Sequence, residues 1–443
     1  MRTGFIILML TTFTVAYAQQ KVKAVGPGKN EITLMHRAQQ ALTDVIVHDV
    51  FSPPVASRIY LYANLSAYEV LALENNRINS FANYREMPSI PKAGKDVYLP
   101  LAALAAFFNT SFQLIFSEQR LADSANLFYK EFRKQVPDAK RFNASIAFGK
   151  QVSDSILKLA YRDNYKETRS MRRYSVTSAS GRWIPTPPGY MAAIEPHWGK
   201  MRPFMLDSAA QFRPPVPFEY DDATGSFHKQ ALEVYEAVKN LTKEQRDISL
   251  FWDCNPFFLN TNGHLMFATK KLSPGGHWMS IAAIASKKTG ADIYTTVKAY
   301  TFTAIALYDG FISCWDEKYR SVYIRPETYI NSKIDESWRP LLQTPPFPEY
   351  TSGHSVISNA AAAVLQSIFG DDVLIEDNSE VPYGLPVRSF PSFQAAAEEA
   401  AISRLYGGIH FRQAIENGQV QGRHIGEFIS NRLSGKNSRV DTE

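Results

Sequence analysis

The sequence predicts an all-α protein. Apolar residues recur at three- and four-residue spacing through most of the chain, which is the period of an amphipathic helix. The alternating polar and apolar segments that a sizeable sheet needs are missing. The chain has 443 residues, 45% hydrophobic and 21% charged, an ordinary balance for a globular protein with a large core. We therefore expect two packed helical bundles that together form one compact domain.

The predicted helices are the segments in which apolar residues keep helical spacing. They occupy most of the first 161 residues and most of the chain after residue 226. In chain order they span residues 31–49, 54–74, 100–116, 122–135, 144–161, 226–239, 276–288, 291 to about 315, 352–369, 395–406 and 411–433.

Three stretches interrupt this series. Residues 165–217 are rich in Pro, Gly, Ser and aromatic side chains. Aromatic residues suit packing better than solvation, so this stretch is expected to be a long ordered crossover and not a disordered linker. Residues 331–351 and 370–393 also read as loops, and they flank the helix predicted at 352–369. The chain shows no internal repeat.

The first eighteen residues read as a signal peptide. Arg2 supplies a positive start, residues 5–15 form a short apolar stretch, and Ala16-Tyr17-Ala18 is a small-x-small cleavage site. The apolar stretch is too short to span a bilayer comfortably. We expect an exported, soluble protein made of residues 19–443.

Composition excludes several other classes of protein. The formal charge of +5 is small for this length, and no basic run with interleaved aromatic residues indicates nucleic-acid binding. No segment after the leader reaches the roughly 18 apolar residues of a membrane-spanning helix. Cys254 and Cys314 make no disulfide framework, although one bond between them stays open. No haem-attachment motif and no zinc-type Cys/His motif is present.

Three short motifs in the last third of the chain carry groups suited to an oxyanion. Arginine offers a rigid fork of donors that matches tetrahedral oxygens, and lysine adds a compact positive charge. A serine and a glycine at the start of a helix expose free amide groups to the positive end of the helix dipole. The motifs contain, in order, Lys318 and Arg325; Ser352, Gly353 and His354; and Arg404 and His410. One imidazole could bind or attack the central atom of the oxyanion while the other moves protons. Phosphate and vanadate both fit such a pocket.

These motifs resemble the Lys-x6-Arg-Pro, Pro-Ser-Gly-His and Ser-Arg-x5-His motifs shared by vanadium-dependent haloperoxidases and type 2 phosphatidic acid phosphatases. The resemblance is strongest over residues 250–430, and the length and leader resemble those of secreted bacterial vanadium iodoperoxidases. Thr351 stands where the usual motif has proline. The resemblance implies a haloperoxidase-like fold for residues 19–443, with a vanadate site in the C-terminal half.

The resemblance also implies how the oxyanion would be held. Lys318, Arg325 and Arg404 would neutralise the vanadate oxygens. Ser352 and the Gly353 N–H would donate hydrogen bonds to it.

The two histidines and the lysine would do the chemistry. The resemblance implies that His410 binds vanadium through a ring nitrogen, that His354 acts as acid and base toward hydrogen peroxide, and that Lys318 assists. Vanadium(V) would act as a Lewis acid, and a halide would leave as hypohalous acid. Iodide is the expected substrate and bromide the next, with no nucleic-acid or membrane partner and a monomer favoured.

A phosphatase is the main alternative, because His410 could attack a phosphate ester while His354 protonates the leaving alcohol. In the phosphatases an Asp four residues after the nucleophilic His commonly orients it, and here that position is Ala414. Some haloperoxidases keep that Asp, so Ala414 weakens the phosphatase hypothesis without excluding it. A non-catalytic oxyanion-binding protein is the third possibility.

Four further residues are candidates for the pocket wall or its support. Trp315 and Phe347 resemble aromatic wall positions of haloperoxidases, where an apolar pocket admits a poorly hydrated halide. Asp316 could tune the rim, although an exposed loop carboxylate is the simpler interpretation. Asp253 resembles a family carboxylate that pairs with the pocket arginine, so an Asp253–Arg404 contact is expected. His277 lies in a Pro-Gly-Gly-His-Trp stretch and is interpreted as structural.

Overall fold

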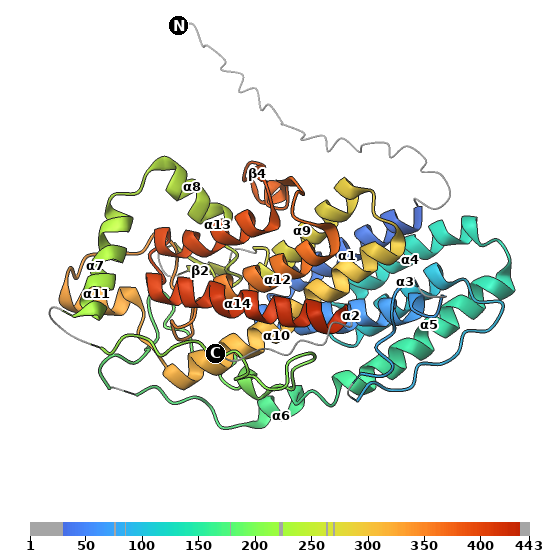
Figure 1. Cartoon of the computed structure of the whole chain (residues 1–443), viewed down its shortest axis with the longest axis horizontal. Coiled ribbons are helices and arrows are strands. Elements are labelled where there is room, and N and C mark those ends of the chain that lie inside the picture. Colours follow the sequence, from blue (N-terminus) through green and yellow to red (C-terminus); the bar gives the residue numbers. More distant parts are fainter. Residues whose placement is uncertain are drawn as a thin grey trace, which may run out of the picture.

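The computed structural model describes residues 30–74, 77–84, 86–177, 179–220, 225–262, 265–268 and 271–434. The predicted signal peptide lies outside these residues. The prediction of an all-α fold is confirmed, since helices form nearly all of the regular structure (Figure 1). In chain order the helices are α1 (Asn30–His48), α2 (Pro53–Leu71), α3 (Leu99–Phe112), α4 (Glu118–Gln135), α5 (Ala139–Ala160), α6 (Tyr165–Ser170), α7 (Ser226–Lys239), α8 (Lys243–Phe251), α9 (Pro274–Thr289), α10 (Ile293–Ser321), α11 (Pro326–Lys333), α12 (Gly353–Phe369), α13 (Phe393–Tyr406) and α14 (Arg412–Leu433).

Small irregular elements complete the fold. Two antiparallel pairs of short strands are present in the described chain, β1 (Leu259–Asn262) with β2 (Leu265–Ala268), and β3 (Ile375–Asp377) with β4 (Arg388–Phe390). In the loops that the structure describes, two single turns of 3-10 helix are present, η1 (Trp198–Lys200) and η2 (Val381–Tyr383). None of the described helices combines the length and apolar character required to cross a bilayer.

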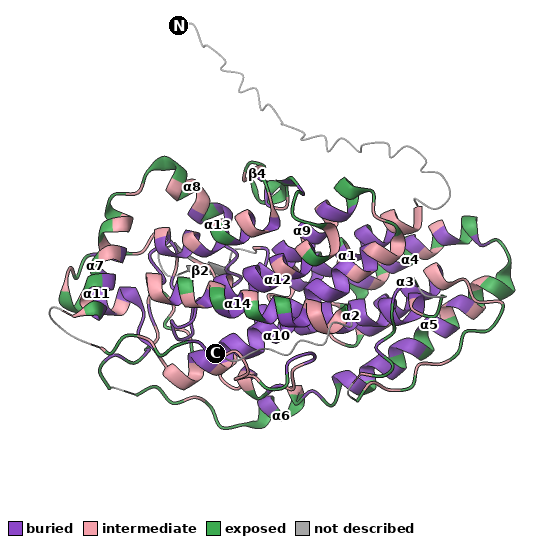
Figure 2. Cartoon of the chain, in the orientation of Figure 1, coloured by how far each residue is buried: buried purple, intermediate pink, exposed green. Residues whose placement is uncertain are grey.

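The core runs along three central helices. Every residue of α2 is buried, and α10 and α12 are buried over most of their length (Figure 2). Helix α2 packs against α3 and α10, α10 packs against α12, and α12 packs against α13 and α14. A second, smaller cluster of buried side chains joins α7 and α11 to the facing ends of α13 and α14. The oxyanion motifs lie next to this smaller cluster.

Helix α14 approaches α12 closely because three glycines at four-residue spacing face it. An added Cβ on Gly418 would lie 2.9 Å from the Ser355 Cβ, and one on Gly426 would lie 2.6 Å from the Ala360 carbonyl oxygen. At Gly422 an added Cβ would overlap the Val356 carbonyl oxygen. The glycines therefore allow the start of α14, next to His410, to lie against the start of α12.

Gly422→Ala is expected to lower the free energy of unfolding, because the new methyl group meets a backbone oxygen that no side-chain rotation can move, and such overpacking costs about 1–3 kcal/mol. The intrinsic gain of about 1 kcal/mol from replacing a helical glycine by alanine offsets only part of this. Urea unfolding of the purified variant measures the change. Gly94→Ala is the matched control, since an added Cβ there meets no described atom within 4 Å. Equal unfolding midpoints for both variants would contradict the close packing of α12 and α14.

The stretch at 165–217 is an ordered excursion, as predicted. Trp183 and Trp198 are completely buried within it. The Asp309 carboxylate on α10 accepts hydrogen bonds of 2.6–2.9 Å from the backbone N–H groups of residues 204–206. These contacts attach the excursion to the central helix.

Several predicted boundaries were wrong. Helix α10 continues to Ser321, so Lys318 lies in its last turn and not in a loop. Helix α8 was missed, although Thr242 and Gln245 form a capping box at its start. Helix α11 was also missed, although a proline occupies its first turn. Both helices are short, and their apolar spacing is too brief to be recognised.

Candidate functional site

The three motifs come from five elements that meet at one end of α12. Lys318 lies in the last turn of α10, and Arg325 precedes the first residue of α11. Ser352 caps α12, and Arg404 lies in the last turn of α13. His410 lies in the short connection between α13 and α14.

The start of α12 is built to present free amide groups. The Ser352 hydroxyl oxygen accepts a hydrogen bond of 3.3 Å from the Ser355 N–H, which leaves the hydroxyl hydrogen free to donate. The Ser352 N–H donates to the Ala414 carbonyl at 3.0 Å, so α14 fixes the cap. Gly353 begins the helix proper, and an added Cβ there would lie 3.6 Å from the Trp315 ring. The Gly353 amide can thus be approached without a side chain in the way.

His410 is oriented on both sides of its ring. Its Nδ1 lies 2.8 Å from Glu349 Oε1, and its Nε2 lies 3.1 Å from Arg325 Nη1. A carboxylate accepts and a guanidinium donates, so the proton belongs on Nδ1 and the Nε2 lone pair faces the arginine. Burial and the positive charge of Arg325 hold the pKa of His410 well below its ordinary value. The imidazole is therefore neutral, and its Nε2 lone pair, which accepts from Arg325 in this structure, could bind a metal in place of that hydrogen bond.

Glu349 is the functional residue that the sequence interpretation missed. Its Oε1 accepts from His410 and, at 2.9 Å, from the Phe411 N–H. Burial raises the pKa of Glu349 to about 7, against the opposing charges of Arg325 and Lys318. Glu349 takes the place of the carboxylate expected at position 414. Because Glu349 supplies an orienting carboxylate, the alanine at position 414 does not disfavour a phosphatase.

The two arginines are held by backbone carbonyls and keep spare donors. Arg325 donates from Nε to the Phe347 carbonyl at 3.0 Å and from Nη1 to the Ile409 carbonyl at 2.8 Å. Arg404 donates from Nη1 to the Trp252 carbonyl at 2.6 Å. Arg325 Nη2 and Arg404 Nε are buried and have no hydrogen-bond partner among the described residues. Such fixed, unsatisfied donors suit an anion, because orienting them costs nothing on binding.

Lys318 is placed differently from the expectation. Its Nζ donates to the carbonyls of Pro348, Glu349 and Thr351 at 2.9, 2.9 and 2.6 Å. An ammonium group has three donors, so all of them are used. Lys318 thus fixes the loop that carries Glu349 and Ser352, and it contributes positive charge from behind this loop.

Anion affinity is expected to fall as the pH rises through about 7. Burial lowers the pKa of Lys318 to about 7, while Cys314, Arg325 and Glu349 act on it electrostatically. The pKa of Glu349 is raised to about 7 as well. Below this pH Lys318 is positive and Glu349 neutral; above it Lys318 is neutral and Glu349 negative. Both changes make the site less positive.

Calorimetric titration with sulfate measures this effect, since the charge of sulfate is constant near neutral pH. The association constant should fall by up to about tenfold per pH unit for each proton coupled to binding. In the Lys318→Met variant the association constant for sulfate should change less steeply with pH. An association constant that rises with pH would contradict this account of the site.

A small, mainly apolar pocket opens beside these groups. Gly353, His354, Arg404 and His410 line one side of it. The other side is mainly apolar and is formed by Pro53, Pro256, Phe257, Phe311, Trp315, Pro345, Phe347 and Ile409. The Trp315 and Phe347 rings lie 4.9 Å apart between centroids. Both aromatic residues therefore line this pocket.

The two candidate aspartates are placed elsewhere. Asp253 forms an ion pair with Lys271, and in the described chain it makes no ion pair or hydrogen bond with Arg404. Its charge still acts on Arg404, opposing the fall in pKa that burial causes. Asp316 lies on α10 and pairs with Arg320 at 2.6 Å, outside the residues that line the pocket. Asp253 therefore acts on Arg404 through its charge without forming an ion pair with it among the described residues, and Asp316 lies in a helix and not in a loop. Lys271 and Arg320 are the ion-pair partners of these two carboxylates.

Fold and site together define a helical-bundle protein with a buried, cationic oxyanion pocket. Residues 298–437 match the family model of the VCPO second helical-bundle domain. The structure is similar to that of a bacterial vanadium-dependent iodoperoxidase, with 48% sequence identity and a TM-score of 0.85. This match covers 90% of the present chain and 96% of the iodoperoxidase chain. The chain belongs to the family of vanadium-dependent haloperoxidases.

More distant relatives share the fold. A holo bacterial vanadium-dependent chloroperoxidase is 15% identical with a TM-score of 0.65, and the match covers 88% of this chain and 94% of that one. The apo form of such a chloroperoxidase is 16% identical with a TM-score of 0.64, covering 87% and 95%. A comparison with curated protein sequences gives no match.

Proposed function

We propose that this protein uses vanadate and hydrogen peroxide to oxidise a halide to hypohalous acid, with iodide as the preferred halide. The observation that carries the proposal is the neutral His410 imidazole, which Glu349 orients so that Nε2 faces a buried arginine. The 48% identity to a bacterial vanadium-dependent iodoperoxidase supports the choice of iodide.

The residues present fit a vanadate ion. Arg325 Nη2, Arg404 Nε and His354 Nε2 are buried polar atoms without a partner in the described part of the chain. We infer that the two arginines and the amides at the start of α12 hold the oxyanion. His410 Nε2 would be its one protein ligand. When bound, vanadate supplies a Lewis acid that activates hydrogen peroxide toward attack by a halide.

His354 is the group best suited to move a proton. Burial and the charge of Arg404 lower its pKa well below the ordinary value, so the imidazole is neutral near pH 7. It lines the pocket, where its unpartnered Nε2 could take a proton from hydrogen peroxide and return it later. The histidine beside it cannot share this role, because a proton on His410 Nε2 would remove the ligand lone pair.

The aromatic side chains that line the pocket favour the binding of a large halide. Trp315 and Phe347 face the pocket, and their rings also lie over cations, with Lys318 Nζ 5.2 Å and the Arg325 guanidinium carbon 5.1 Å from the Phe347 centroid. An apolar wall in front of buried positive charge favours a weakly hydrated anion over a strongly hydrated one, because less hydration free energy is lost on entry. Iodide is the halide that meets this condition best, and it is also the easiest to oxidise.

The deciding experiment is halide oxidation by the purified protein with hydrogen peroxide. Iodide, bromide and chloride are run in parallel, with and without vanadate, and with excess phosphate as a competitor. The expected result is vanadate-dependent, phosphate-inhibited oxidation that is fastest with iodide. Hydrolysis of a chromogenic phosphate ester without halide oxidation would replace the proposal by a phosphatase. Tight vanadate binding without either activity would indicate a non-catalytic oxyanion-binding protein.

We also propose that the protein is exported as a monomer of residues 19–443. The support is the leader pattern before Gln19 and its cleavage site. Mass spectrometry of the protein from the producing cell should give Gln19 as the first residue, and light scattering should give the mass of one chain. An uncleaved chain in the cytoplasm would contradict export.

A further inference from the structure

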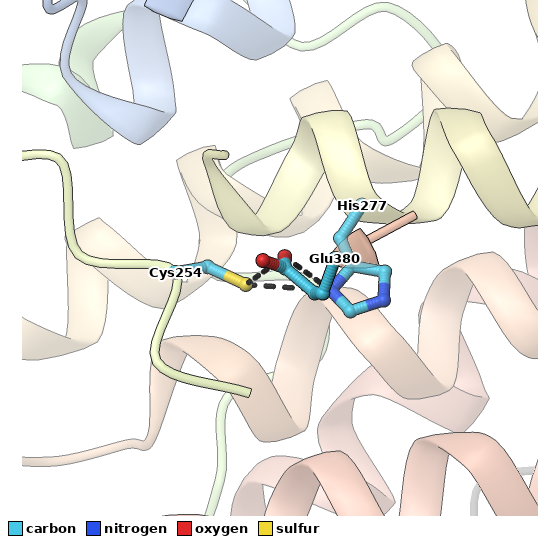
Figure 3. Close-up of side chains that lie close together, drawn as sticks. All are labelled: Cys254, His277 and Glu380. Atoms are coloured by element: carbon cyan, nitrogen blue, oxygen red, sulfur yellow. Dashed lines mark hydrogen bonds and ion pairs between the residues drawn. The ribbon is translucent and has the colours of Figure 1, made fainter. Parts of the chain in front are cut away.

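A second polar cluster lies beside the oxyanion pocket and has the opposite character. Cys254, His277 and Glu380 point their side chains toward one another from three elements (Figure 3). Cys254 follows α8, His277 lies in the first turn of α9, and Glu380 immediately precedes η2. All three are buried. Their donors are a sulfur, an imidazole nitrogen and a carboxylate oxygen, which attract a cation where the neighbouring arginines attract an anion.

The distances match those between ligands of a tetrahedral metal ion. The Cys254 Sγ lies 3.4 Å from His277 Nδ1, and His277 Nδ1 lies 3.5 Å from Glu380 Oε1. The Cys254 Sγ lies 4.0 Å from Glu380 Oε1. Zinc bonds of about 2.3 Å to sulfur and about 2.0–2.2 Å to nitrogen or oxygen place neighbouring tetrahedral ligands about 3.3–3.6 Å apart. If the Cys254 sulfur and the Glu380 oxygen moved slightly closer together, all three distances would fit tetrahedral coordination.

The histidine is already oriented as a metal ligand. His277 Nε2 lies 2.7 Å from Asp377 Oδ2 on β3, so the carboxylate accepts a hydrogen bond from Nε2–H and Nδ1 points toward the cluster. A bound cation would take the place of a proton on Nδ1. The Trp252 ring stacks on the imidazole at 4.4 Å and blocks its rotation. A carboxylate behind a ligating histidine is the usual support of a zinc site.

We propose that Cys254, His277 and Glu380 bind one divalent transition-metal ion, for which Zn²⁺ is the best match. A thiolate with an imidazole suits zinc, whereas magnesium and calcium prefer oxygen ligands alone. Three protein ligands leave a fourth position for a solvent molecule. This inference does not depend on the proposed halide oxidation.

The metal ion would fix the wall of the oxyanion pocket. Cys254 lines that pocket, and the Trp252 carbonyl two residues earlier accepts the hydrogen bond from Arg404 Nη1. A cation bound to Cys254 would hold this short segment, and with it the guanidinium. Loss of the metal should therefore weaken the binding of vanadate or phosphate as well.

The test is metal binding by the untagged full chain. After removal of metal with a chelator, Zn²⁺ is added, excess is dialysed away, and the bound metal is measured by mass spectrometry. Co²⁺ is used in parallel, because cobalt bound to a thiolate has a charge-transfer band in the near ultraviolet. The expected result is one Zn²⁺ per chain, and a cobalt spectrum with the thiolate band.

Variants identify the ligands. Cys254→Ser and Glu380→Gln should lose the bound Zn²⁺, and Cys254→Ser should lose the thiolate band. Cys314→Ser is the matched control, since it removes the other buried cysteine and should keep both. If the ligand variants do not fold, Asp377→Asn should still weaken Zn²⁺ binding by about 10- to 100-fold through the support of His277. No bound metal in the wild type, or a thiolate band that survives in Cys254→Ser, would overturn the proposal.

Discussion

The His410→Ala variant is expected to lose vanadate binding and, with it, all measurable halide oxidation. The neutral His410 Nε2 would provide the one bond between the protein and the metal, and water cannot replace it with the same orientation. The arginines and the α12 amides would still attract an oxyanion, but only as a weakly held counterion. Equilibrium dialysis with vanadate and the rate of iodide oxidation measure the two losses. Circular dichroism establishes that the variant is folded.

The matched control is His354→Ala, which removes the other imidazole of the pocket. This variant should keep vanadate affinity while its turnover falls by about 10²- to 10⁴-fold, the usual contribution of a positioned acid–base group. The two histidine variants thus separate binding from proton transfer. Wild-type activity in His410→Ala would contradict its assignment as the ligand, and lost vanadate binding in His354→Ala would contradict the assigned proton role.

Substitution of Glu349 is expected to have the second-largest effect. Glu349→Ala removes the acceptor for both the His410 Nδ1–H and the Phe411 N–H. The ring can then rotate or place its proton on Nε2, and vanadate affinity should fall by about 100-fold. Glu349→Gln keeps a carbonyl acceptor for the Nδ1–H but loses the negative charge that favours this tautomer. Because the loss of that charge also makes the site more positive, the fall in vanadate affinity should be smaller, nearer about tenfold. Vanadate titration of both variants measures the difference.

Glu69→Gln is the control for these variants. Glu69 is also completely buried and also accepts from a backbone N–H, that of Phe81, but it lies on α2, outside the oxyanion site. Its vanadate affinity should equal that of the wild type. Equal affinities for Glu349→Ala and the wild type would show that His410 is oriented by other contacts.

The fold class and the oxyanion motifs were predictable from the sequence because both depend on local patterns. Helical periodicity identified the central helices, and motif spacing identified Ser352, Gly353 and His354 at the start of one of them. Short helices were missed because they carry few apolar repeats. The end of α10 was placed too early because its last turn carries Lys318 and Arg320, which interrupt the apolar pattern.

The contacts that depend on loop geometry could not be predicted. Glu349 precedes Ser352 by three residues, but no spacing rule relates it to His410, which is 61 residues later. Asp253 was assigned to Arg404, yet Lys271 is its partner in the fold. Cys254, His277 and Glu380 are far apart in the chain, so the absence of a zinc-type motif in the sequence gave no indication of their meeting.

Lys318 makes two parts of the site energetically dependent on each other. Its three hydrogen bonds hold the loop from Pro348 to Thr351, and this loop carries the carboxylate that sets the His410 tautomer and leads directly to the cap of α12. A substitution at Lys318 would therefore remove a charge and also release Glu349. The free-energy costs of changing these two residues are not independent contributions to be added, because the second change acts on a loop that the first has already freed.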